Sequence, residues 1–331
     1  MRRMARTHRL RALLLAAACL AAGLCQAAGF QFIRVPAGTD GPALRGAVWS
    51  PCAAPPGPIP LGPITLQGTE NCPVAGQRLP LILLSHGSGG SFLGHHDTAA
   101  ALADAGFVVA AINHPGDHFQ DLGRQGHLSA FATRPADLRR SLDYLLGGWP
   151  GRGVLDAGRV GVFGFSRGGY TALVAAGAVP DWTQARRLCA PGSAVPLCGE
   201  LRRREWPQPP VRDPRVRAVV AADPLNLFGA EGLKAVSVPL QLWASAHGGD
   251  GVEPADVAAL RRALPVAVEW HRVAGAGHFA FLAPCPAAMA EAAPDLCRDA
   301  PGFDRVAFHA DFNAQVAGFF QRALAGAPGP R

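Results

Sequence analysis

Ser166 is the residue whose surroundings most clearly suggest nucleophilic chemistry. It lies at the centre of Gly164-Phe165-Ser166-Arg167-Gly168-Gly169, between an apolar run at 160–163 and a helical pattern at 170–176. Glycines two residues before and after a serine relieve crowding in a sharp strand-to-helix turn that exposes the hydroxyl. A serine hydroxyl becomes a useful nucleophile only with a base in hydrogen-bond reach. The alternative is a glycine-rich loop in which Ser166 has no role.

His278 is the candidate base. It follows the last predicted strand, 266–273, in Ala274-Gly275-Ala276-Gly277-His278-Phe279. A glycine-flanked imidazole after this strand could reach over the serine, accept the hydroxyl proton and later return it to the leaving group. The order of nucleophile, acid and base along the chain agrees with this assignment. A surface histidine without a catalytic role is the alternative.

Two aspartates compete for the role of the acid that orients His278. Asp250 follows the predicted strand 239–245, and Asp223 directly follows the predicted strand 216–222. Either carboxylate could fix the imidazole tautomer and stabilise the imidazolium. Either could instead cap the helix or turn that comes next. We prefer Asp250 and keep Asp223 as the alternative acid.

An acyl-transfer site also needs donors for a developing oxyanion. The backbone N–H of Arg167, at the start of a predicted helix, and that of Ser88, in the turn after the predicted strand 79–85, are the candidates. Histidines at 95–96 and 114–118 resemble metal ligands in composition. Adjacent residues on a helix do not face one ion, however, so we expect turn and helix-start polar groups there, with no metal and no cofactor.

These motifs must be positioned by the alternating strand and helix patterns around them. Repeated βα units predict an α/β fold with a mostly parallel central sheet and helices on both faces. In such a sheet, ligands bind beyond the carboxyl ends of the strands, where the motifs fall. The further predicted elements are an antiparallel edge hairpin (30–36 and 44–49), a surface loop (51–76), a strand (107–113), helices (95–105, 135–146, 254–263 and 305–324) and an insert above the sheet (180–213).

The first 28 residues have the pattern of a cleaved secretory signal peptide. A basic start is followed by a short apolar stretch and small residues, too short in its apolar part for a stable membrane anchor. A lipoprotein acylated at Cys19 is not expected, because Ala16 stands where a larger aliphatic residue is usual. The segment carries five arginines and no acid, so the formal net charge of +7 becomes +2 without it. A nearly balanced chain with no basic stripe excludes a nucleic-acid partner.

Six cysteines remain after this segment, in three local pairs. Nearest-neighbour pairing predicts disulfides Cys52–Cys72, Cys189–Cys198 and Cys285–Cys297, one of fifteen possible connectivities. No C-x-x-C or paired histidine spacing favours a zinc site instead. Disulfides persist in oxidising compartments, so the cysteines and the signal pattern together predict a secreted or periplasmic protein with one domain at 29–331.

Three motifs together resemble the α/β-hydrolase superfamily. These are Leu84-Ser85-His86-Gly87-Ser88-Gly89-Gly90, the turn around Ser166 and the segment that ends in His278-Phe279. Within the superfamily they are similar to exported bacterial dienelactone-hydrolase-like proteins, which are related to platelet-activating-factor acetylhydrolases. Dienelactone hydrolases use a cysteine nucleophile where this chain has Ser166. An acid followed four residues later by proline, as at Asp250, matches the dienelactone-hydrolase pattern, whereas Asp223 matches the acetylhydrolase pattern.

The resemblance and the motifs imply a secreted serine hydrolase. We expect it to cleave carboxylic esters of small molecules or lipids, a lactone or a short-chain phospholipid ester included, through an acyl-enzyme. A non-catalytic binding protein on the same fold, and an amidase or perhydrolase with the same triad, are the alternatives. The natural substrate, the acyl-chain length and the oligomeric state are not encoded in any motif of the sequence.

Overall fold

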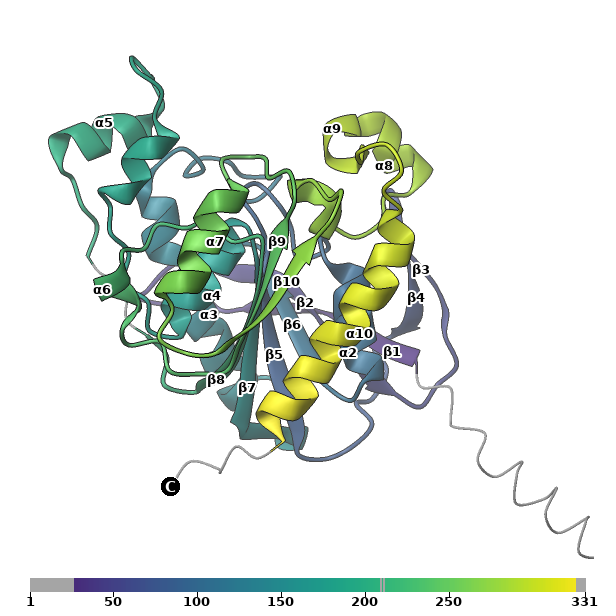
Figure 1. Ribbon diagram of the computed structural model, residues 1–331. Helices are drawn as coiled ribbons and strands as arrows, with labels where there is room; N and C mark the ends of the chain where they lie inside the picture. The colour runs from purple at the N-terminus through teal and green to yellow at the C-terminus, as the bar shows by residue number, and fades with distance from the viewer. Residues whose placement is uncertain (1–26, 209, 211, 326–331) are drawn as a thin grey trace, which may run out of the picture.

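The computed structural model describes residues 27–208, 210 and 212–325 (Figure 1). Within these residues ten strands form one sheet in the order β10-β9-β8-β7-β5-β6-β2-β1-β4-β3. The strands are β1 (Ala27–Val35), β2 (Leu44–Cys52), β3 (Gly57–Leu61), β4 (Ile64–Glu70), β5 (Leu79–Ser85), β6 (Val108–Ile112), β7 (Leu155–Phe165), β8 (Val216–Ala222), β9 (Leu240–Ser245) and β10 (Val268–Val273).

The strands from β6 to β10 run parallel to their neighbours, as the βα alternation predicted. β5, at the centre of this part, is apolar along its whole length, and the side chains from Pro80 to Ser85 are buried. A strand covered on both faces needs such a continuous apolar sequence. β2 then pairs antiparallel with β6 and β1, so the sheet is mixed at its N-terminal side.

Helices cover both faces of the sheet (Figure 1). Leu142, Leu173 and Leu260 belong to the buried cluster on one face, and Leu102 and Phe320 to the cluster on the other. Burying one such side chain contributes roughly 1.5–3 kcal/mol. The helices are α2 (His96–Asp104), α3 (Leu128–Gly147), α4 (Arg167–Ala175), α5 (Pro196–Arg203), α6 (Ala230–Leu233), α7 (Pro254–Ala263), α8 (Ala287–Ala292), α9 (Pro294–Cys297) and α10 (Arg305–Leu324), with short 3₁₀ turns η1 (Arg152–Val154), η2 (Gln184–Leu188) and η3 (His278–Phe281).

Two predictions about the N-terminal region are wrong. The β1–β2 hairpin is not at the sheet edge, because β4 and β3 extend the sheet beyond it. The segment predicted as a loop at 51–76 contains these two strands. Its prolines hid a strand pattern: Pro58 and Pro60 alternate with the buried Ile59, and proline is tolerated on an edge strand whose N–H groups face away from the sheet.

α3 begins seven residues earlier than the pattern predicted, because Pro135 lies inside the helix rather than at its start. Helix α5, which belongs to the insert, contacts the N-terminus of α3. Glu200 of α5 accepts hydrogen bonds from the backbone N–H of Leu128 at 2.7 Å and lies 2.6 Å from His127 Nδ1. An acceptor at the first turn satisfies a helix N–H that has no partner within the helix. The insert is thereby joined to the N-terminus of α3.

The structure joins the six cysteines in the three nearest-neighbour pairs, Cys52–Cys72, Cys189–Cys198 and Cys285–Cys297. The second disulfide links η2 to α5 within the insert. The predicted signal peptide lies outside the described residues up to residue 26, as does Cys19, while Ala27 and Ala28 begin β1. Across the described part of the chain, none of the helices combines the length and apolarity that crossing a membrane requires.

Candidate active site

Ser166 lies between β7 and α4 in a strained conformation. Its φ of 56° and ψ of −121° are unusual for a residue with a side chain. The flanking glycines are required by close backbone contacts: a Cβ at Gly164 would collide with the carbonyl of Gly168, and one at Gly168 with the carbonyl of Ser85. The backbone N–H of Ser166 donates to the Ala222 carbonyl at 3.0 Å. The predicted strand–turn–helix context of the serine is thus present.

His278 and Asp223 form a buried pair. Nδ1 of His278 lies 2.7 Å from Oδ2 of Asp223, and both side chains are at most 1 % exposed. The carboxylate is held from its other side by Ser245, whose backbone N–H and hydroxyl each donate at 2.8 Å. A carboxylate at Nδ1 places the imidazole proton there and leaves Nε2 as an acceptor.

The preference for Asp250 as the partner of His278 is wrong in this geometry. Asp250 is exposed in a tight turn with a φ of 50°, and none of the hydrogen bonds among the described residues joins it to His278. The turn instead supports the histidine through its backbone, because the N–H of His278 donates to the Gly248 carbonyl at 2.8 Å. Asp223 reaches the imidazole because it directly follows β8, which lies beside β7, the strand that leads to Ser166.

The imidazole of His278 is fixed by stacking as well as by hydrogen bonding. Its ring lies against the ring of Phe165, with centroids 4.6 Å apart and an angle of 29° between the planes. Nε2 is buried and has no hydrogen-bond partner in the described part of the chain, so it is not bonded to the Ser166 hydroxyl here. Catalytic hydrogen bonds are often long before substrate binds. A buried acceptor without a hydrogen-bond partner, stacked on the residue that precedes the strained serine, suits proton abstraction.

The turn after β5 packs directly against Ser166. A Cβ at Gly87 would lie 3.3 Å from the Cβ of Ser166 and 3.0 Å from the Phe165 ring, so only glycine fits there without displacement. Ser88 is the next residue of this turn, and Arg167 is the first residue of α4. Both residues therefore belong to the two backbone segments that adjoin Ser166, the turn after β5 and the start of α4.

A cavity of about 310 Å³ opens beside the imidazole. Its lining includes His278 but not Ser166, Ser88 or Arg167. Its walls come from the turns after β9 and β10 and from the segment after α9. The lining residues are His247, Gly248, Gly249, Gly277, His278, Phe279, Ala280, Arg298, Asp299 and Ala300.

The histidines that resembled metal ligands have other partners. His95 packs between Phe163 and Phe165, with ring centroids 5.2 Å from each. His114 lies 3.1 Å from Asp137 through Nδ1 and 2.9 Å from the Ser85 hydroxyl through Nε2. Among the residues that the structure describes, no group of three or more His, Cys, Asp and Glu side chains is arranged to hold a metal ion.

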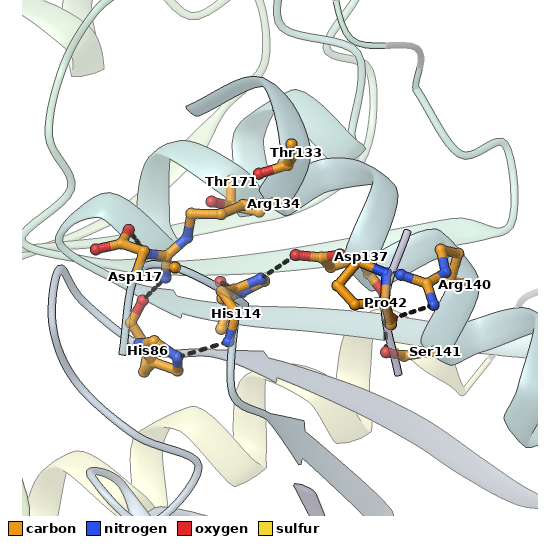
Figure 2. Close-up of polar contacts among 12 residues, drawn as sticks. Pro42, His86, His114, Asp117, Thr133, Arg134, Asp137, Arg140, Ser141 and Thr171 are labelled. Carbon is orange, nitrogen blue, oxygen red and sulfur yellow. Dashed lines mark hydrogen bonds and ion pairs between the residues drawn. The ribbon is translucent and has the colours of Figure 1, made fainter. Parts of the chain in front are cut away.

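Sequence reasoning missed a buried polar network next to the Ser88 turn (Figure 2). Arg134 of α3 donates to Asp117 at 2.5 Å and to the carbonyl of His86, and the His86 ring accepts from the backbone N–H of His114 at 3.2 Å. Burial, with Arg134 nearby, lowers the pKa of His86 to about 3, so this ring is neutral. Burial raises the pKa of Asp137 to about 7.

A signal for this network was present in α3. The apolar residues Phe131, Leu138, Leu142 and Leu145 follow a helical spacing toward the core. Arg134 lies on the same face of the helix and is buried. An arginine is rarely buried unless it is paired with an anion. A cation on the core-facing side of an amphipathic helix therefore indicates a buried anion on a neighbouring element.

Comparison with known proteins supports the α/β-hydrolase fold and the assignment of the chain as a hydrolase. Residues 76–231 match the family described as "Serine aminopeptidase, S33", a segment that includes Ser166 and Asp223 and ends before His278. No curated protein matches the chain. Among solved structures, it is similar to a ferulic acid esterase from Streptomyces cinnamoneus, with 20% identity, a TM-score of 0.64 and coverage of 94% of this chain and 93% of that one. It is also similar to a dienelactone hydrolase from Anabaena variabilis, with 18% identity, a TM-score of 0.52 and coverage of 90% and 99%.

Proposed function

We propose that this chain, which has the α/β-hydrolase fold that its motifs predicted, is a serine hydrolase that cleaves carboxylic esters through an acyl-enzyme. The observation that carries the proposal is the His278–Asp223 pair at 2.7 Å. Its imidazole stacks on Phe165, the residue before the strained Ser166, and its Nε2 has no hydrogen-bond partner among the described residues. Asp223 is proposed as the acid, Ser166 as the nucleophile and His278 as the base.

The proposed reaction follows from these positions. His278 Nε2 accepts the Ser166 proton while Oγ bonds to the ester carbonyl carbon, and the carbonyl oxygen becomes an oxyanion. The N–H groups of Ser88 and Arg167 stabilise that oxyanion. The imidazolium, stabilised by Asp223, returns the proton to the alcohol as the carbon–oxygen bond breaks. Water then releases the acid from Ser166 by the same steps, again with His278 as base.

Replacing Ser166 by alanine tests the nucleophile. Ser166→Ala should lower the turnover of p-nitrophenyl acetate to the background rate and abolish stoichiometric labelling by a fluorophosphonate probe, since both need Oγ. The matched control is Ser129→Ala, an exposed serine of α3 that should keep full activity and labelling. Wild-type turnover retained in Ser166→Ala at an unchanged melting temperature would exclude the proposed nucleophile, and a folded wild-type protein that neither turns over nor labels would favour a binding protein.

The proposed substrates are small esters. The cavity of about 310 Å³ supports this only through His278, because Ser166 is not among its lining residues. A panel of nitrophenyl esters of increasing acyl length, with methyl ferulate and a lactone, measures the preference. The amidase alternative has a specific basis, because the matching family is described as a serine aminopeptidase. An aminoacyl p-nitroanilide in the same panel tests it: a kcat/KM higher for the anilide than for every ester would replace the esterase assignment by an amidase.

We also propose that the protein is exported, with residues 1–28 removed as a signal peptide. Three disulfides within the described residues support this, because such bridges persist in oxidising compartments. The mass of the protein recovered from a periplasmic or secreted fraction measures the cleavage point. A full-length chain retained in the cytoplasm with reduced cysteines would contradict the proposal.

A further inference from the structure

Asp117 lies in the turn that follows β6, and its carboxylate is buried, with 1 % of the side chain exposed. Oδ1 accepts a hydrogen bond from the backbone N–H of Gly89 at 3.2 Å and faces the Ser88 hydroxyl at 3.4 Å. Oδ2 accepts from the guanidinium groups of Arg134 at 2.5 Å and Arg167 at 2.8 Å. One carboxylate therefore contacts three separate parts of the fold: the turn after β5, α3 and the start of α4.

Two of these parts carry the proposed oxyanion donors. Gly89 directly follows Ser88, so its hydrogen bond to Asp117 fixes the peptide next to the Ser88 N–H. Arg167 supplies the other donor from its own backbone, and its side chain is held by Asp117, by the Gln125 carbonyl at 3.0 Å and by the Phe131 ring at 4.5 Å. The carboxylate thus links the two segments that carry these N–H groups.

Arg134 is the second residue that contacts the turn, and Figure 2 shows it between Asp117 and His86. Besides pairing with Asp117, it donates to the carbonyl of His86, two residues before Ser88. The turn is accordingly held at both ends, at His86 by the guanidinium and at Gly89 by the carboxylate. A rigid turn matters because preorganised donors stabilise a developing oxyanion without reorganisation during the reaction.

The charges of the cluster also favour an anion. Burial alone would raise the pKa of Asp117, but Arg134 and Arg167 lower it below its ordinary value, so the carboxylate stays ionised. The contact itself joins two guanidinium groups to one carboxylate and so carries one positive charge in excess, and Asp137 is the further acid near Arg134. In a site of low dielectric such an excess stabilises a nearby negative oxygen more strongly than it would in water.

We propose that Asp117 is a positioning residue that holds the Ser88 and Arg167 N–H groups at the spacing an oxyanion requires, with Arg134 as its buried partner. The proposal rests on the proposed serine-hydrolase function and adds to it a residue that touches neither the substrate nor the reacting atoms. It follows from one carboxylate contacting both donor-bearing segments.

The test measures transition-state binding in Asp117→Asn. The amide keeps the size of the side chain but removes its charge and places an N–H₂ group against donors that need an acceptor. Losing one oxyanion donor outright costs roughly 10²–10³-fold in kcat, so two displaced donors should cost about 10–100-fold, with KM changed by less than about threefold. The Ki of an aryl boronic acid, whose adduct with Ser166 places an oxygen between the donors, should rise by a similar factor.

The matched control is Asp121→Asn, in the same turn. Among the described residues, the Asp121 carboxylate accepts from the backbone N–H groups of Gly116 and Gly123 and from no other group, so this variant should keep kcat and the boronate Ki. If Asp117→Asn does not fold, Arg134→Lys provides the second variant: it keeps the charge but cannot hold Asp117 and His86 together, and the same parallel loss is expected, at about 5–30-fold.

The outcomes separate this proposal from the proposed function. A folded Asp117→Asn with the kcat of Asp121→Asn, or one that loses kcat while its boronate Ki stays unchanged, overturns the positioning role alone. A wild-type protein that does not react with a fluorophosphonate at Ser166 overturns both. A parallel loss in kcat and boronate affinity in a wild-type background that labels at Ser166 supports both.

Discussion

The choice between the two aspartates can be tested by replacing each with asparagine. In the structure Asp223 accepts three hydrogen bonds, from the backbone N–H and hydroxyl of Ser245 and from His278. Asp250 is exposed and has no bond to the histidine among the described residues. The two variants therefore remove the same charge from two strand-end turns, and only one of them changes what the imidazole faces.

An asparagine at 223 cannot satisfy both neighbours as the carboxylate does. If its oxygen accepts from the Ser245 backbone N–H, its N–H₂ group points at His278 Nδ1. The imidazole must then carry its proton on Nε2, the atom that should accept the Ser166 proton. If the amide is flipped, its N–H₂ group faces the Ser245 N–H, and a buried donor loses its acceptor. The first arrangement disables the base, and the second destabilises the fold by about 1–3 kcal/mol.

The expected loss in kcat for Asp223→Asn is about 10³–10⁴-fold. The upper value is that known for the equivalent change in a Ser-His-Asp protease, and it corresponds to about 5 kcal/mol of transition-state stabilisation. Asp250→Asn should change kcat by less than about twofold. Steady-state hydrolysis of p-nitrophenyl acetate, with circular dichroism of each variant, makes the measurement. Equal losses, or a larger loss in Asp250→Asn, would refute the assignment of Asp223.

Two further predictions concern stability. Burial raises the folded-state pKa of Asp137 from 3.8 to about 7. Between these two pH values the folded chain holds a proton that the unfolded chain releases. The free energy of unfolding therefore falls as the pH rises from about 4 through 7. Asp137→Asn, which resembles the protonated form, should lose less thermal stability than wild type between pH 5 and pH 8 by calorimetry; an identical pH dependence would contradict this. Replacing Cys52 and Cys72 by serine should lower the free energy of unfolding by about 3 kcal/mol, because the bridge closes a loop of 20 residues. Dithiothreitol should then lower the stability of this double variant by less than it lowers that of wild type, because one of the bridges is already missing. Urea titration of the double variant against wild type measures the difference, and unchanged stability would indicate that the pair is not oxidised.

The parts of the fold that were predicted from sequence are those in which one pattern dominates. β5, α7 and α10 begin and end where their apolar runs or helical periods do. β3 and the start of α3 were missed because proline was interpreted as a break in both places. In β3 the prolines lie on an edge strand, and in α3 the helix continues through Pro135. In both cases the tertiary position decides what a proline does.

The same limit applies to the site. Ser166 and His278 were identified because each lies in a glycine-rich turn whose sequence resembles a known motif. Asp223 and Asp250 both follow strands, and the sequence does not show that β8 lies between β7 and β9. Asp117 was missed because its partners come from segments 28, 17 and 50 residues away, and no local pattern connects them.

The proline-bearing strand β3 also affects how the protein can associate with itself. It is the last strand of the sheet on its side, and Pro58 and Pro60, which lie two residues apart on it, have no backbone N–H to offer a further strand. A strand edge normally offers a row of donors on which another chain can add a strand and begin an aggregate. Here two of the donors are missing, so a chain at high concentration is protected from sheet extension at this end.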